Sequence, residues 1–177
     1  MRKLFISTLF ACSAAFAEDI NIPNHLIDFP EFRSIVIETA AERDGRRLTE
    51  AQFLSAMEEK DVIVLDARSA NRFAERHITG AKNLPFTDFT AATLESLIPS
   101  KDSKVLIYCN NNFLGDQRAF PSKSPGASLN LSTYTSLKAY GYTNVFELGP
   151  LLDIHKTSIS FSGSLVEAAQ QGVAPNP

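Results

Sequence analysis

Tryptophan is absent from this 177-residue chain, and cysteine is nearly absent, with only Cys12 and Cys109 present. Two cysteines cannot build the dense disulfide framework that stabilises very small secreted domains. The three histidines and two cysteines are not grouped at the spacings that bind a metal ion. The sequence therefore predicts no metal site.

Long apolar runs are also missing, apart from one near the N-terminus. The chain begins Met1-Arg2-Lys3, is apolar over residues 4–11 and reaches Ala15-Phe16-Ala17. A basic start, a short apolar core and small residues at the end are typical of a secretory signal peptide over residues 1–17, and we expect cleavage before Glu18. The run is shorter than the roughly 20 residues of a membrane-spanning helix, so we predict an exported protein, periplasmic or secreted, without a membrane span. Lipoprotein processing at Cys12 is the alternative.

Basic residues are too few and too scattered for a nucleic-acid-binding surface. Loss of Arg2 and Lys3 with the signal peptide leaves 15 basic against 20 acidic residues, a net charge of about −5. A mildly acidic chain without a basic run is a poor match to nucleic acid or to an anionic membrane. Cys109 is then the only cysteine of the mature chain and has no intrachain partner. It is either a small buried hydrophobe or a thiol in use.

The 160 residues that remain are enough for one domain with a hydrophobic core. Short apolar runs alternate with helical patterns, which favours an α/β fold with a parallel central sheet and helices on both faces. Thr49 and Gln52 have the spacing of a capping box, and Gly141 follows a helix at the position where glycine ends helices. We expect strands at 46–48, 62–66, 81–84, 105–108 and 144–148, and helices at 30–45, 49–57, 70–76, within 86–98, at 128–140 and at 165–170.

The stretch around Cys109 is the most informative part of the chain. Val105–Tyr108 has the apolar and aromatic pattern of a strand that is buried on both faces. Cys109 follows at once, and then come Asn110, Asn111 and Asn112, residues that suit a tight loop. Because ligands of open α/β sheets bind beyond the carboxyl ends of the strands, a thiol at this point is placed to react.

Three ordered motifs resemble those of the rhodanese-like (sulfurtransferase) family. They are a strand-end Asp-x-Arg coupled to His-Ile-x-Gly-Ala and Asn-x-Pro, a strand ending in Tyr-Cys, and Gly-Tyr-x-Asn-Val after a helix. In this chain they are Asp66-Ala67-Arg68, His77-Ile78-Thr79-Gly80-Ala81, Asn83-Leu84-Pro85, Tyr108-Cys109 and Gly141-Tyr142-Thr143-Asn144-Val145. The resemblance covers about residues 48–150. It implies a single rhodanese-like domain over residues 18–177, with an N-terminal helical arm at 18–47 and a C-terminal tail at 151–177.

The resemblance also implies a chemistry. In this family the strand-end cysteine attacks the outer sulfur of a donor such as thiosulfate, becomes a persulfide and passes the sulfur to a thiophilic acceptor. The reactive form is the thiolate, which helix N-termini and nearby cations favour. The implied partners are a small sulfur-containing anion and a thiol acceptor, and no metal or organic cofactor is needed. We expect catalysis by Cys109, substrate binding by Asn110, Asn111, Asn112, Phe113, Leu114, Gly115 and Arg118, and structural support from Asp66, Arg68 and His77.

The segment after Cys109 departs from the family pattern. The family often has an arginine or lysine soon after the cysteine, whereas this chain has none until Arg118, and the helix resumes only near Ser128. We expect Asp116–Ala127 to be a semi-rigid flap outside the core. It either brings Arg118 or Lys123 over the sulfur to bind an anion or simply covers the site.

Two other functions compete with sulfur transfer. One is a non-catalytic rhodanese-like module that binds a partner or ligand while Cys109 stays inert. The other is phosphate or arsenate chemistry, which needs Cys-x5-Arg to place a guanidinium on the oxyanion, and position 115 is Gly. Disulfide exchange lacks a resolving cysteine within the chain. We expect a monomer, because no long apolar stripe lacks a use within the chain.

Overall fold

The computed structural model describes residues 22–172. The predicted signal peptide, its cleavage site and Cys12 lie outside the described residues, as do residues 173–177. The strands are β1 Arg47–Leu48, β2 Ile63–Asp66, β3 His77–Ile78, β4 Lys82–Asn83, β5 Val105–Tyr108, β6 Phe113–Leu114, β7 Val145–Leu148, β8 Leu152–Asp153 and β9 Phe161–Ser162. The α-helices are α1 Phe29–Glu42, α2 Glu50–Met57, α3 Ala70–Glu75, α4 Ala91–Leu97, α5 Leu129–Ala139 and α6 Ser164–Gln170. The 3-10 turns are η1 Arg43–Arg46, η2 Phe86–Asp88, η3 Asn110–Asn112 and η4 Pro125–Ala127.

Five of the strands form the central sheet, in the order β1-β7-β5-β2-β4, and every neighbouring pair is parallel. The carboxyl end of β5 therefore lies between the ends of β7 and β2. The predicted α/β class and parallel sheet are confirmed. The predicted bounds of β5 are also confirmed. All four of its residues are buried, and a strand buried on both faces is marked in the sequence by a continuous apolar run.

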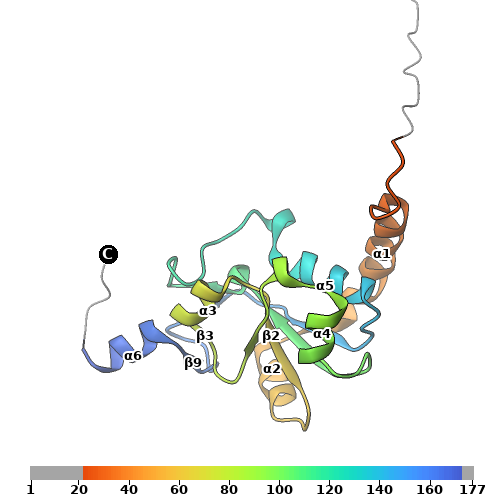
Figure 1. Ribbon diagram of the computed structural model, residues 1–177. Helices are drawn as coiled ribbons and strands as arrows, with labels where there is room; N and C mark the ends of the chain where they lie inside the picture. The colour runs from red at the N-terminus through yellow and green to blue at the C-terminus, as the bar shows by residue number, and fades with distance from the viewer. Residues whose placement is uncertain (1–21, 173–177) are drawn as a thin grey trace, which may run out of the picture.

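Alternate residues of the strands pack into two separate apolar layers. Leu106 and Tyr108 of β5 face the layer that contains Phe53 of α2, whereas Val105 and Ile107 face the layer that contains α4 and α5. The helices accordingly cover both faces of the sheet, and Figure 1 shows α1 at one end of the molecule and α6 at the other.

Local signals at the helix ends are confirmed. The backbone N–H of Gln52 donates to Thr49 Oγ1 at 3.3 Å, and the backbone N–H of Thr49 donates to Gln52 Oε1 at 2.9 Å, which completes the capping box. Gly141 follows α5 with φ +84°, a backbone conformation that glycine adopts at little cost. One short strand was not expected from the sequence, because His77 and Ile78 pair antiparallel with β9.

Residues 116–127 were predicted to be a flap outside the core, and this is wrong for Ala119 and Phe120, whereas residues 122–127 are exposed. Ala119 and Phe120 are fully buried. The Phe120 ring lies 4.7 Å from the Phe113 ring and 5.9 Å from the Phe161 ring, centroid to centroid. The three aromatic rings form a cluster that holds the loop against the sheet.

The reason given for a monomer also fails, because α1 and the residues before it carry apolar side chains that the described chain leaves uncovered. Phe32 is 52% exposed and Val36 40% exposed, and only Thr39 of α1 is buried. Further exposed apolar side chains in this arm are Ile22, Leu26, Ile27, Phe29 and Ile37. The oligomeric state itself stays a prediction.

Between residues 22 and 172, no helix has both the length and the apolar character needed to cross a bilayer.

Candidate active site at Cys109

Cys109 connects β5 to a single turn of 3-10 helix. Its backbone N–H donates to Asn112 Oδ1 at 2.8 Å, and its Sγ accepts from the backbone N–H of Asn112. The Oγ of Ser128, the N-cap residue just before α5, lies 3.4 Å from Sγ. The sulfur is thus held between an amide and a hydroxyl, both able to donate to a thiolate.

The three asparagines do not present their side chains to a ligand. Asn110 donates to the carbonyl of Pro121 at 2.8 Å, and Asn112 donates to the carbonyl of Leu148 at 2.7 Å. Asn111 forms a two-way amide pair with the backbone of Lys123. These side chains fix the loop after Cys109, so the expected cradle of donors can come only from the main chain. At the start of a helical turn, the first N–H groups have no partner within the turn.

A pocket of about 290 Å³ opens at Cys109. Cys109 is 1% exposed and is one of the residues that line this pocket. The walls come from the loop after β5, the start of α5, the end of β7 and the N-terminal arm. The lining residues are Arg43, Arg47, Cys109, Asn111, Asn112, Pro125, Ser128, Asn130, Leu131, Glu147, Leu148 and Gly149.

The charged residues of this pocket were not identified from the sequence. Glu147 of β7 is opposite Arg47 of β1 and Ile107 of β5 in the sheet register. Its carboxylate lies 2.6 Å from Arg43 Nη2 and 3.2 Å from Arg47 Nε. Burial raises the pKa of Glu147 above its ordinary value, and the two arginines offset this only in part. The sequence contained one signal of these charges, which is Glu147 itself in an otherwise apolar strand. A glutamate in such a strand is rarely buried without a charged partner.

Five residues predicted to bind substrate do not line this pocket: Asn110, whose amide donates to Pro121, and Phe113, Leu114, Gly115 and Arg118. Phe113 is fully buried in the aromatic cluster, and Leu114 pairs with β8. Gly115 has φ +95° and lies against Ile154, His155 and Asp153. Arg118 pairs with Glu75 at 2.9 Å. The main-chain path turns away from Cys109 after η3 and carries the last four of these residues with it.

The motif residues Asp66 and Arg68 form a buried network beside the site. Arg68 Nε donates to Asp66 Oδ1 at 2.9 Å, and Arg68 Nη1 donates to the carbonyl of Ala119 at 2.8 Å. The Tyr108 hydroxyl donates to Asp66 Oδ2 at 2.5 Å and accepts from the backbone N–H of Ile78 at 3.1 Å. The network joins the ends of β2 and β5 to the loop of Ala119, so it fixes the strand end from which Cys109 follows.

His77 does not line the pocket at Cys109. Its ring stacks on Phe73 with centroids 3.8 Å apart, and Nδ1 lies 2.7 Å from the carbonyl of Phe73. These contacts hold the turn after α3.

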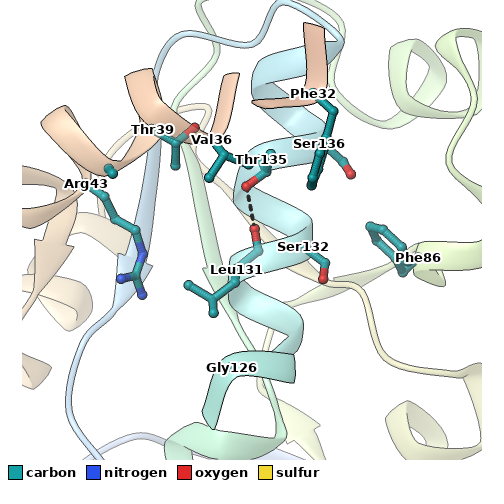
Figure 2. Close-up of a pocket in the computed structure, with 11 residues that line it drawn as sticks. Phe32, Val36, Thr39, Arg43, Phe86, Gly126, Leu131, Ser132, Thr135 and Ser136 are labelled. Atoms are coloured by element: carbon teal, nitrogen blue, oxygen red, sulfur yellow. Dashed lines mark hydrogen bonds between the residues drawn. The ribbon is translucent and has the colours of Figure 1, made fainter. Parts of the chain in front are cut away.

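A second pocket, mainly apolar and of about 420 Å³, lies between α1 and α5 (Figure 2). Phe32 and Val36 contribute one wall, and Leu131 and Thr135 contribute another. Arg43 and Leu131 line both this pocket and the one at Cys109. The boundary between the two pockets is therefore shared by the residue after α1 and the first turn of α5.

Comparison with known proteins identifies the class of fold. The rhodanese-like domain model matches residues 49–149. The BH2092 protein of Bacillus halodurans is 20% identical, with 75% of this chain and 88% of that chain covered and a TM-score of 0.51. The rhodanese-like domain of the Anabaena sp. Alr3790 protein is 18% identical, with 75% and 89% covered and a TM-score of 0.51. No curated protein matches the chain.

This chain belongs to the rhodanese-like domain family. At these identities, the two solved structures show a common fold and nothing finer. The activity has to be argued from the pocket at Cys109.

Proposed function

We propose that this protein is a sulfurtransferase that carries a sulfane sulfur on Cys109. The observation that supports this most directly is the position of the thiol, which follows the central strand, faces two hydrogen-bond donors and lines a pocket with two arginines. Donors and cations of this kind favour the thiolate, which is the nucleophilic form.

The proposed reaction has two displacement steps. The Cys109 thiolate attacks the outer sulfur of thiosulfate, a new S–S bond forms, and the bond within thiosulfate breaks with its electron pair leaving on sulfite. A thiolate acceptor then attacks the outer sulfur of the Cys109 persulfide. The bond to Cys109 breaks, its electron pair returns to the Cys109 thiolate, and the acceptor leaves as a persulfide. Covalent capture divides one difficult transfer into two easier steps, and neither step needs an oxidant or a reductant.

Mass spectrometry of the intact protein tests the first step. After incubation with thiosulfate, we expect one added sulfur that dithiothreitol removes. The Cys109→Ser variant should gain none, while Ser122→Ala, a change in the neighbouring loop, should still gain it. No added sulfur on the folded protein would contradict the proposal, and the binding module with an inert Cys109 would remain.

We also propose that the protein acts outside the cytoplasm after removal of residues 1–17. The basic start, short apolar stretch and Ala-x-Ala end support this. N-terminal sequencing of the protein from a cell fraction enriched in exported proteins should begin at Glu18. A full-length N-terminus in the cytoplasmic fraction would contradict export.

A further inference from the structure

The two arginines of the Cys109 pocket come from the N-terminal arm. Arg43 follows α1 and Arg47 begins β1, so both precede the residues 49–149 that match the family. Lys123 instead lines a different pocket with Arg68 and Arg72, and Arg118 is paired with Glu75. The cationic wall of the Cys109 pocket is therefore supplied by the segment before the matched domain.

Contacts on the two sides of the pocket hold these arginines in place. Glu42, next to Arg43, accepts a hydrogen bond from the Tyr134 hydroxyl at 3.1 Å and pairs with Lys138 at 3.0 Å, which fastens the end of α1 to α5. Arg47 Nη2 donates to the carbonyl of Gly149 at 3.2 Å. The arm is docked at the pocket by specific polar contacts.

Glu147 binds both Arg43 and Arg47 from the buried side of the pocket. Its side chain is 1% exposed, whereas those of Arg43 and Arg47 are 26% and 46% exposed. A ligand in the pocket therefore meets the guanidiniums before the carboxylate, and two positive charges outweigh one negative charge. Each guanidinium carries five N–H donors in a planar fork that fits the oxygens of a carboxylate, sulfonate or similar group.

We propose that Arg43 and Arg47 form the subsite that holds the oxyanion group of the sulfur compound reacting at Cys109. This rests on the proposed function and names its substrate class, a small sulfur compound with an oxyanion group close to its reactive sulfur. The pocket volume of about 290 Å³ lies near the lower end of the roughly 300–1,000 Å³ of small-molecule sites. Both inorganic thiosulfate and a short carboxylated thiol have this chemistry.

Two alkylating reagents of similar size test the subsite without any sulfur transfer. Iodoacetate is an anion and iodoacetamide is neutral, so the ratio of their rate constants at Cys109 reports the charge of the pocket. We expect this ratio to fall about three- to tenfold in Arg43→Gln and in Arg47→Gln, because one positive charge near the sulfur is lost. The ratio should stay near that of the unmodified protein in Arg43→Lys and in Arg33→Gln, the latter removing the same charge from an exposed position of α1. A high salt concentration should reduce the difference between variants.

The Glu147→Gln variant gives the opposite sign. Removing the buried negative charge should raise the ratio of iodoacetate to iodoacetamide reactivity, with thermal melts showing that each variant is folded. A ratio that does not change in folded Arg43→Gln and Arg47→Gln would overturn the subsite. A Cys109 that resists both reagents would overturn it too, because no ligand would then reach the sulfur.

Two kinetic arms separate the sources of the oxyanion. The rate of persulfide formation from thiosulfate (loading) reports on binding of the inorganic anion. The rate of sulfur transfer from the persulfide to mercaptoacetate (discharge) reports on binding of a carboxylated thiol, and neutral 2-mercaptoethanol is its control. Slower loading in Arg47→Gln supports thiosulfate as the ligand of the subsite. Slower discharge by mercaptoacetate alone supports the carboxylated thiol, and equal effects on both thiols with normal loading would overturn the subsite. If no persulfide forms in any variant, the proposed function fails, while the alkylation ratio still decides the charge of the pocket.

Discussion

Tyr108→Phe is the sharpest test of the network that positions Cys109. The substitution removes one oxygen and leaves the ring of a fully buried side chain in place. That oxygen donates to Asp66 Oδ2 at 2.5 Å and accepts the backbone N–H of Ile78 at 3.1 Å. Burial and the Asp66 carboxylate raise the pKa of Tyr108 well above its ordinary value, so the hydroxyl stays protonated across the physiological range.

The expected cost follows from these two hydrogen bonds. A hydrogen bond to a charged group contributes about 1.5–3 kcal/mol, and a buried N–H left without an acceptor costs about 1–3 kcal/mol. Asp66 keeps its bonds from Arg68, so the carboxylate is not left unpaired. We therefore expect the free energy of unfolding to fall by about 2–4 kcal/mol. For a domain of this size, that corresponds to a decrease in Tm of roughly 5–15 °C.

Urea denaturation of wild type and variant measures this cost, and Tyr142→Phe is the matched control. Tyr142 is equally buried, but its hydroxyl makes one hydrogen bond, to the carbonyl of Ile98 at 3.2 Å. Its loss should cost about 0.5–1.5 kcal/mol. If Tyr108→Phe costs no more than Tyr142→Phe, then the link between the ends of β2 and β5 adds nothing beyond an ordinary hydrogen bond, and the reasoning is wrong.

Three further substitutions test other parts of the structure. Burial raises the pKa of Glu147, so wild type should lose stability as the pH rises from about 4.5, the unfolded value, through the raised folded value; Glu147→Gln should lack this decline, and parallel urea midpoints from pH 4 to 8 would contradict it. Phe120→Ala should lower the free energy of unfolding by about 3–5 kcal/mol, whereas a loss below about 1 kcal/mol would show that the loop is outside the core. Gly163 has φ +117°, and an added Cβ would lie 2.7 Å from the carbonyl oxygen of Glu75; Gly163→Ala should therefore cost at least about 1–3 kcal/mol in a thermal melt, while Gly126→Ala, which has open space, should not.

The fold could be predicted because its signals are local. The apolar runs that became β2, β5 and β7 are buried along nearly their whole length, and Thr49 with Gln52 marks the start of α2 by a hydrogen-bonding pattern of four residues. The two-residue strands β6, β8 and β9 have no such pattern. They exist because distant segments meet, as Phe113 does with Leu152.

The candidate site was predictable only in part, for the same reason. Cys109 could be found because it follows a recognisable strand, and the pairing of Arg68 with a carboxylate follows from the motif that contains both residues. The wall of the pocket could not be found, because Arg43 and Glu147 are more than a hundred positions apart and meet only when β1 pairs with β7. The sequence could not show what the asparagine side chains bind, because an amide can bind either a ligand or a carbonyl of its own chain.

The pocket at Cys109 draws its two arginines from outside the region that matches the family model. The matched region, residues 49–149, contains the strand end, Cys109 and Glu147, but not Arg43 or Arg47. Without the arm, Glu147 would be a nearly buried carboxylate with neither arginine beside it, a costly arrangement because a buried charge needs a partner. The arm and the domain are therefore matched at this point by charge, and the same contact that stabilises Glu147 brings positive charge to the pocket of Cys109.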